Sequence, residues 1–267
     1  MIEITSLGIG SNNFGPLSTV AFLVTAGGEQ VLVDCGPDTP KMVRKAGHQF
    51  VDLSSIVVTH KHLDHMLGVP YLVFGRSVEV LGKKRADPEY SIPPLTIHCS
   101  REIESFIVDT LALSQPDFNL EQQRISFDEI PQVAVSKTIC DMRFDFVPVD
   151  HTVPNVGFVL SSGGQKLLCY TSDMVKGTEL IELARGAKVA IVECMVTDDF
   201  RGFTKTALHA GVSDASAFLQ EVKPEQAFLV HIRPDLMPQA AQMSLAVSNA
   251  SKVDARYFRE GEKIQLR

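Results

Sequence analysis

The sequence contains no tryptophan and only four tyrosines in 267 residues. Single-stranded nucleic acids are commonly bound by stacking their bases on aromatic side chains, so this scarcity disfavours an extended strand-binding surface. Basic residues are also few, with 25 lysines and arginines against 32 acidic residues and a formal net charge of −7. A large nucleic-acid footprint depends on a basic face. Both shortages favour a small substrate, which bound cations would still attract locally.

Long apolar runs are absent as well. No stretch reaches the roughly 18 residues needed to cross a bilayer, and the N-terminal MIEITSLGIGSNNFG has no basic residues ahead of its apolar part, unlike a signal peptide. The five cysteines form no CxxC pair, and an odd count without an export signal is typical of reduced thiols. We expect a cytoplasmic protein that does not contact a membrane.

Expected strands and helices alternate along the chain. Helices are expected at residues 38–47, 101–114, 178–186, 214–222 and 235–250. Strands are expected at residues 54–58, 95–98, 143–149, 188–193, 226–230 and 256–265. The charged, proline-rich segment 82–94, GKKRADPEYSIPP, is expected to be a surface loop. This order predicts a layered α/β domain, with a mixed sheet or with two packed sheets and helices outside.

Two segments repeat one pattern. FLVTAGGEQVLVD at residues 22–34 and FVLSSGGQKLLCYTSD at residues 158–173 each contain an apolar strand, a Gly-Gly turn and a second apolar strand that leads to an aspartate. The repetition has two interpretations at this point. Either the chain contains two unrelated hairpins, or its two halves arose by duplication.

The segment THKHLDHMLG, residues 59–68, concentrates four potential metal ligands directly after an apolar run: His60, His62, Asp64 and His65. Imidazole and carboxylate groups are ligands that zinc, manganese and iron accept. Two histidines that are two positions apart face the same way in an extended chain. A turn after them would carry Asp64 and His65 to a second point nearby, which favours two adjacent metals over a histidine-rich surface loop.

Three further polar residues each end an apolar run, namely His151 after MRFDFVPVD, Asp173 after KLLCYTS and His231 after QAFLV. A single histidine in such a place is more often packed or solvated than metal-bound. With HKHLDH in the same chain, we expect all three to be ligands.

The motif HxHxDH, with a later histidine, aspartate and histidine in that order, resembles the metallo-β-lactamase superfamily of metal-dependent hydrolases. VLVDCGPDTPKMVRKAG and IVVTHKHLDHMLGVPYLV resemble the first half of its ribonuclease Z-like branch, and HTVPNVGFVLSSGGQKLLCYTSD and AKVAIVECM resemble the second half. The resemblance implies an α/β fold, the four-layer αβ/βα sandwich, as a single domain over residues 1–267. It favours duplication, with two pseudo-repeated halves at about 1–140 and 141–267.

The resemblance also implies roles for individual residues. It implies one metal held by His60, His62 and His151, a second held by Asp64, His65 and His231, and Asp173 as the bridge. Asp34 would support the ligand loop, and His209 would contact a phosphate or assist the leaving group, so that Asp64 and His209 are the expected catalytic residues. His48 and His98 match no motif. A homodimer is common in the resembled branch, and we expect one here.

The reaction implied is hydrolysis with two divalent metal ions, zinc first, although manganese and iron accept the same ligands. Such ions activate water at neutral pH, and His209 could protonate a leaving alcohol. Leu63 stands where ribonuclease Z commonly has glycine, which resembles class II cyclic-nucleotide phosphodiesterases. We therefore expect a small phosphodiester substrate, such as a cyclic nucleotide.

Other functions stay open. The second choice is 3′ processing of RNA as in ribonuclease Z, although the chain shows no long Gly/Pro-rich basic arm. The same fold hosts thioester and lactone hydrolases. A redox diiron site is disfavoured because such relatives usually have glutamate in place of His62. A noncatalytic scaffold is disfavoured because all seven ligand positions are filled.

Overall fold

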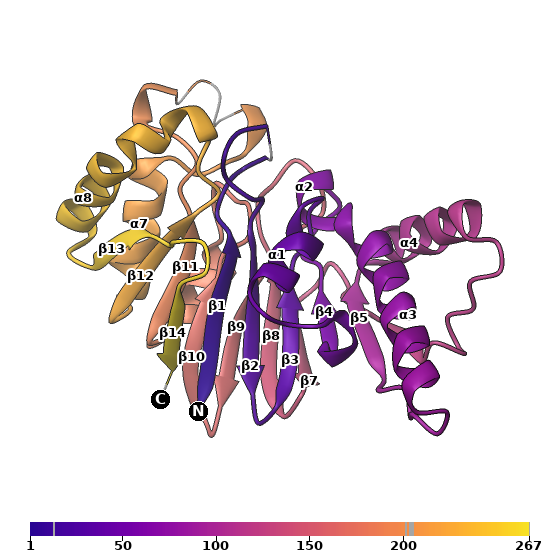
Figure 1. The fold of residues 1–267 in the computed structure, drawn as a ribbon. Coiled ribbons are helices and arrows are strands. Elements are labelled where there is room, and N and C mark those ends of the chain that lie inside the picture. The colour runs from indigo at the N-terminus through magenta and orange to yellow at the C-terminus, as the bar shows by residue number, and fades with distance from the viewer. Residues whose placement is uncertain (13, 201, 203–205, 267) are drawn as a thin grey trace.

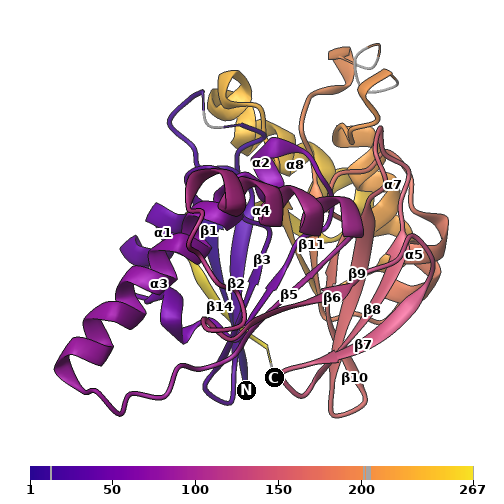
Figure 2. The same cartoon turned by 90° about the vertical axis from the view of Figure 1, so that its right-hand side faces the viewer.

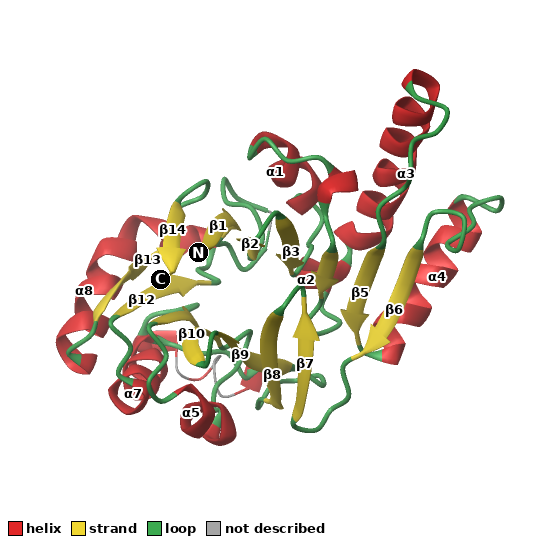
Figure 3. Ribbon diagram, turned by 90° about the horizontal axis from the view of Figure 1, so that it is seen from below, coloured by secondary structure: helices red, strands yellow, loops and turns green. Residues whose placement is uncertain are grey.

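The computed structural model describes residues 1–12, 14–200, 202 and 206–266. Two seven-stranded sheets pack face to face, and helices cover the outer face of each sheet (Figures 1 and 2). Seen from below, the order of layers is helices, sheet, sheet, helices (Figure 3). The four-layer sandwich expected from the sequence is therefore confirmed.

Each sheet combines antiparallel and parallel strands. The first sheet has the order β14-β1-β2-β3-β4-β5-β6, and the second has the order β13-β12-β11-β10-β9-β8-β7. The strands of the first sheet are β1 (Ile2–Gly8), β2 (Ala21–Ala26), β3 (Glu29–Val33), β4 (Ser55–Val57), β5 (Leu95–Cys99), β6 (Ile125–Glu129) and β14 (Lys263–Leu266). The strands of the second sheet are β7 (Val135–Ile139), β8 (Met142–Pro148), β9 (Val156–Ser162), β10 (Gln165–Tyr170), β11 (Val189–Glu193), β12 (Gln226–Val230) and β13 (Asp254–Tyr257).

The helices divide between the two outer faces. On the first sheet lie α1 (Thr39–Lys45), α2 (Leu63–Met66), α3 (Gly68–Ala86) and α4 (Arg101–Ser114). On the second sheet lie α5 (Thr178–Ala184), α7 (Val212–Val222) and α8 (Ala240–Ser251). Short 3-10 helices occur at η1 (Phe50–Asp52), η2 (Asp198–Phe200) and η3 (Pro234–Gln239). None of the helices described is both long and apolar enough to cross a membrane.

Strand β2 shows how the sequence builds these layers. Phe22 and Val24 face the second sheet and belong to the core between the sheets, whereas Ala21 and Leu23 pack under the helices of the first layer. Successive side chains of a strand point to opposite faces. A strand that is buried on both faces therefore reads as a continuous apolar run, as AFLV does here.

The repeated hairpins occupy matching places in the two sheets. Strands β2 and β3 are joined by Gly27 and Gly28, with φ angles of 59° and 92°, and strands β9 and β10 by Gly163 and Gly164, with φ angles of 57° and 79°. Positive φ at both central residues is the requirement of a tight hairpin turn that glycine meets without strain. In each sheet, parallel strands follow the hairpin. The duplication of two halves stays a prediction.

Two expectations about elements were wrong. Helix α3 was not expected, and it includes residues 82–86 of the segment expected as a surface loop, whereas residues 87–94 contain no helix or strand. The single strand expected at 256–265 is two strands, because the chain turns at Gly261, where φ is 79°. Strand β14 then returns to the first sheet and pairs with β1.

Candidate metal centre

The predicted ligands gather where strands end. His60 and His62 follow β4, His151 follows β8, Asp173 follows β10, and His231 follows β12. The carboxyl ends of parallel strands meet at one edge of a sheet, where open α/β sheets bind their ligands. The corresponding edges of the two sheets lie next to each other in this sandwich. Residues that are far apart in the sequence therefore meet in one place.

The ligand loop turns where the sequence analysis required a turn. His62 is extended, with ψ of 144°, and α2 starts at the next residue and carries Asp64 and His65. The loop at Gly36 holds α2 closely, because a Cβ on Gly36 would lie 2.1 Å from the backbone oxygen of Asp64. Glycine is the residue that tolerates such a backbone approach.

The structure brings the first expected group together. Ligand atoms of His60, His62, His151 and Asp173 all lie within 4.8 Å of one another. The Nδ1 atom of His62 is 3.2 Å from Nε2 of His60 and 3.0 Å from Nε2 of His151. Oδ2 of Asp173 is 3.6 Å from Nε2 of His60.

The second expected group converges in the same way. Ligand atoms of Asp64, His65, His231 and Asp173 also lie within 4.8 Å of one another. Oδ2 of Asp173 is 3.3 Å from Nε2 of His65 and 3.1 Å from Nε2 of His231. Oδ2 of Asp64 is 3.3 Å from Nε2 of His231. Asp173 therefore belongs to both groups.

The residues present fit divalent metal ions. His65 Nε2 and Asp173 Oδ2 are both buried and lie 3.3 Å apart. A divalent cation among these buried donor atoms would satisfy the lone pairs of the imidazole and the carboxylate. Imidazole nitrogens and carboxylate oxygens are the donor set that zinc and similar ions accept.

Three of the inward-facing imidazoles are contacted at their other ring nitrogen by a neighbouring oxygen. Nδ1 of His65 donates to Asp34 at 3.0 Å, Nδ1 of His151 donates to the carbonyl oxygen of Leu208 at 3.1 Å, and Nδ1 of His60 lies 3.1 Å from the hydroxyl of Thr59. Such contacts fix the tautomer and leave the Nε2 lone pair free for a metal. Asp34 thus lies in the supporting position that the resemblance implied.

The backbone around the site is strained. Asp34, Ser172 and His231 have φ angles of 57°, 54° and 65°, in the left-handed region that residues other than glycine rarely adopt. Each costs about 1–3 kcal/mol and persists only when its surroundings fix it. Three of the nine described residues other than glycine with positive φ thus lie beside the ligand groups.

Glu193 is a functional residue that the sequence analysis missed. It ends β11, is fully buried, and its Oε1 accepts hydrogen bonds from Nδ1 of His209 at 2.6 Å and from Nδ1 of His231 at 3.0 Å. Its Oε2 accepts the backbone N–H groups of Met174 at 2.7 Å and Ala210 at 3.1 Å. The available signal was a lone acidic residue at the end of the apolar strand VAIVE. Such a residue is rarely buried unless it is paired.

His209 lies beside the predicted ligands. Its ring is stacked on that of His231 at a centroid distance of 5.1 Å, and its Nδ1 is 3.8 Å from Oδ2 of Asp173. Glu193 engages Nδ1, and Nε2 has no hydrogen-bond partner among the residues that the structure describes. The side chain is 12% exposed, enough to meet a bound substrate.

The pKa values of the ligands differ with their neighbours. Burial holds the pKa of His60 well below its usual value, and the nearby imidazole of His65 lowers it further. Burial also lowers the pKa of His231, but Asp173 and Asp64 outweigh it and raise this pKa to about 10. Metal ligands must be deprotonated. A metal ion would therefore find His60 neutral but would have to displace a proton from His231.

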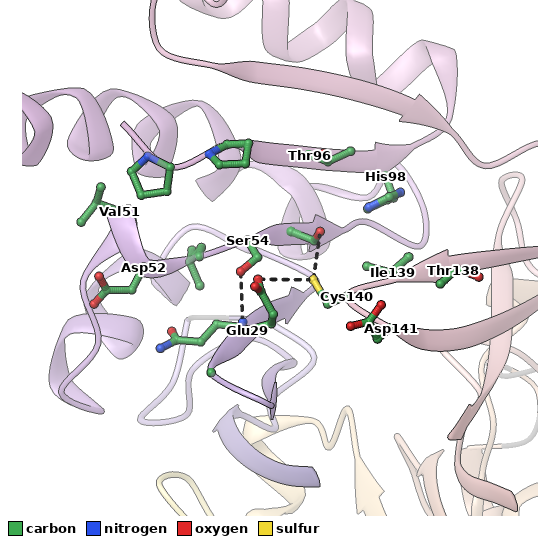
Figure 4. Close-up of a pocket in the computed structure, with 16 residues that line it drawn as sticks. Glu29, Val51, Asp52, Ser54, Thr96, His98, Thr138, Ile139, Cys140 and Asp141 are labelled. Atoms are coloured by element: carbon green, nitrogen blue, oxygen red, sulfur yellow. Dashed lines mark hydrogen bonds between the residues drawn. The ribbon is translucent and has the colours of Figure 1, made fainter. Parts of the chain in front are cut away.

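A separate cavity of about 760 Å³ lies at the amino ends of β3, β4 and β5 (Figure 4). Its walls include Glu29, Cys140 and Ser55, which are in contact, and His98, whose Nδ1 donates to Asp128 at 2.9 Å. None of the predicted ligands lines this cavity. The structure thus places His98 in a hydrogen bond outside the metal centre.

Comparison with known proteins decides the family. A family model described as the beta-lactamase superfamily domain matches residues 29–232, which include the whole of both ligand groups. The chain belongs to the metallo-β-lactamase superfamily. A ribonuclease Z of Bradyrhizobium sp. (strain ORS 278) is 26% identical over 275 residues, which cover 87% of this chain and 91% of that protein. The anti-Pycsar protein Apyc1 of Bacillus phage 010DV004 is 22% identical over 269 residues, which cover 94% and 98%.

The solved structures agree on the fold. The crystal structure of the short form of human tRNase Z superposes with a TM-score of 0.78 at 20% identity and covers 99% of both chains. The ribonuclease Z-like resemblance found in the sequence is therefore confirmed. This member of the metallo-β-lactamase superfamily is a metal-dependent hydrolase that carries a cluster of histidine and aspartate ligands.

Proposed function

We propose that the protein hydrolyses small phosphodiesters, cyclic nucleotides among them, with two divalent metal ions that are normally zinc. The observation that carries this proposal is the position of Asp173 in both ligand groups. A carboxylate shared between two sets of imidazoles suits a pair of neighbouring cations better than a single one. His60, His62 and His151 would hold one ion, and Asp64, His65 and His231 the other.

Bound ions of this kind supply Lewis acidity and an activated water molecule at neutral pH. The chain itself supplies the proton for the leaving group. Burial lowers the pKa of His209, but the carboxylate of Glu193 outweighs this effect, so the pKa of His209 lies above its usual value. This shift favours the protonated form of His209, which can donate a proton from Nε2 to a departing alkoxide.

Several features support a small substrate. The net charge of −7 offers no broad basic surface for a polyanion. Leu63 is 57% exposed on the ligand loop, at the position where its identity resembles the class II phosphodiesterases. RNA is the second candidate, and the similarity to ribonuclease Z over most of the chain is the observation that favours it.

We also propose a homodimer. Helix α3 buries one apolar face against the first layer. On another face, apolar side chains are exposed or half-buried at alternating spacings of four and three residues. These are Leu67, which directly precedes the helix, and Tyr71, Phe74, Val78 and Leu81. That spacing is the seam of paired helices. An apolar stripe of this length on an outer helix is more typical of an interface than of a surface left in water.

For the compartment we propose the cytoplasm. All five cysteines are unpaired. Cys35, Cys169 and Cys194 are buried and pack as small apolar side chains. Unpaired cysteines are typical of a reducing compartment.

One panel of substrates tests the activity. The metal-replete protein is assayed with bis(p-nitrophenyl) phosphate, cyclic nucleotides, precursor transfer RNA and a lactone, with Asp64→Ala as the blank. We expect turnover of the aryl phosphodiester and of at least one cyclic nucleotide. Turnover of the lactone alone would refute phosphodiester chemistry, and turnover of precursor transfer RNA alone would favour the second candidate.

A further inference from the structure

Tyr170 is a buried tyrosine that belongs to neither ligand group. Its hydroxyl contacts Asp34, the carboxylate that supports the ligand loop. Tyr170 is the last residue of β10, is 1% exposed, and donates a hydrogen bond to Oδ2 of Asp34 at 3.0 Å. Its ring packs edge-on against Phe22 of the first sheet, at 5.0 Å, and against Phe158 of the second, at 5.6 Å. The hydroxyl is therefore held in place by the contact between the two sheets.

Asp34 depends on such donors because it is fully buried. Oδ1 accepts the backbone N–H of Thr59 at 2.9 Å and its hydroxyl at 3.0 Å, and Oδ2 accepts Nδ1 of His65 and the hydroxyl of Tyr170, each at 3.0 Å. A buried carboxylate is costly unless its oxygens are hydrogen-bonded. Of these donors, only Tyr170 comes from the second sheet.

Asp34 is connected to a ligand of each group. It accepts directly from His65, and it accepts from Thr59, whose hydroxyl lies 3.1 Å from Nδ1 of His60. The orientation of His60 and of His65 therefore depends on where one carboxylate lies. Tyr170 fixes that carboxylate from the opposite side of the sandwich.

We propose that Tyr170 is a positioning residue of the metal centre, which fixes Asp34 and through it His65 and His60. The inference rests on the proposed metal centre. This role of Tyr170 makes metal affinity depend on the packing of the two sheets, because the hydroxyl belongs to one sheet and its acceptor, Asp34, to the other.

The test is Tyr170→Phe, which removes the hydroxyl and keeps the ring between Phe22 and Phe158. Support residues of this kind typically contribute 10–100-fold to metal affinity, so we expect zinc affinity to fall by roughly 10-fold or more. Affinity is measured by competition with a chromophoric chelator. The matched control is Tyr257→Phe, which removes another buried hydroxyl, bonded at 2.6 Å to the backbone oxygen of Cys194, away from Asp34.

A double-mutant cycle shows whether Tyr170 acts through Asp34. In an Asp34→Asn background, we expect Tyr170→Phe to add little further loss of zinc affinity. As a second readout, the ¹⁵N-correlated imidazole N–H signal of His65 in the metal-free protein should shift in Tyr170→Phe and stay unchanged in Tyr257→Phe. This signal reports the Asp34 contact in each folded variant without needing metal.

The outcomes distinguish a failure of the proposed metal centre from a failure of the proposed role of Tyr170. Failure of the wild-type protein to bind zinc would refute the proposed metal centre itself. Zinc binding by the wild type with equal affinity in Tyr170→Phe, or an equal loss in Tyr257→Phe, would overturn the role of Tyr170 alone. Losses that simply add in the double variant would show that Tyr170 does not act through Asp34.

Discussion

Replacing Glu193 by glutamine tests the arrangement around the proposed proton donor. The carboxylate accepts two imidazole N–H groups on one oxygen and two backbone N–H groups on the other. Glutamine has the same shape, but one of its two polar ends is an NH₂ group, which only donates. Whichever way the amide points, two donors of the protein face a third donor.

The size of the effect follows from this count. Each buried donor left without an acceptor costs about 1–3 kcal/mol, so two of them cost about 2–6 kcal/mol. Small domains are stable by about 5–15 kcal/mol. We therefore expect Glu193→Gln to fold with a lower melting temperature. Loss of the carboxylate also lowers the pKa of His209, which Glu193 holds above its usual value.

The assay is the pH dependence of kcat with bis(p-nitrophenyl) phosphate at saturating zinc. A general acid must be protonated, so activity is present below its pKa and is lost above it; a lower pKa moves the alkaline limb to lower pH. We expect this shift and a fall in kcat at neutral pH of about 10²–10⁴-fold. Glu221→Gln, which removes an exposed partner of Arg185, is the control. A Glu193→Gln profile identical to the wild type would refute the reasoning.

Three further predictions concern the ligands and the exposed face of α3. Asp64→Ala should abolish turnover and lower the bound zinc measured by elemental analysis, whereas a zinc content equal to the wild type would exclude this residue as a ligand. Zinc binding at pH 7 should release about one to two protons, because the pKa of His231 is raised to about 10 and the pKa of His65 is raised well above its usual value by nearby carboxylates in the metal-free protein. Calorimetry in buffers of different ionisation enthalpy measures this number, and a release of zero contradicts it. Val78→Glu should convert the dimer to a monomer in light scattering, while Leu245→Glu, at a 61% exposed position on α8, should not.

The place of the candidate metal centre could be inferred from the sequence because most of the predicted ligands follow an apolar strand, and Asp64 and His65 lie on α2, shortly after β4. HKHLDH after IVV, and single polar residues after FVPV and QAFLV, lie where strands leave the core, so their positions could be inferred without knowing the packing. Glu193 also ends an apolar strand. Its role depends on contacts with His209 and His231, which lie in other segments of the chain. No local sequence pattern indicates those contacts.

Helix α3 was missed for a related reason. The helix buries Val69, Leu72 and Val73 against the first layer and presents Tyr71 and Val78 on another side. Apolar residues on two sides of a helix blur the period that identifies a helix from sequence. The second apolar face, which blurs the period and hid the helix, is thus the same property that supports a dimer.

The left-handed backbone at the ligand loops and the hydrogen bond from Tyr170 to Asp34 both couple metal binding to the packing of the two sheets. Left-handed backbone at Asp34, Ser172 and His231 costs free energy that the contacts between the two sheets must offset. An ion that binds only the folded protein stabilises it by mass action. Because the ligands come from both sheets, metal binding and sheet packing must stabilise each other, so chelation should lower the melting temperature of the whole sandwich and not only loosen the ligand loop.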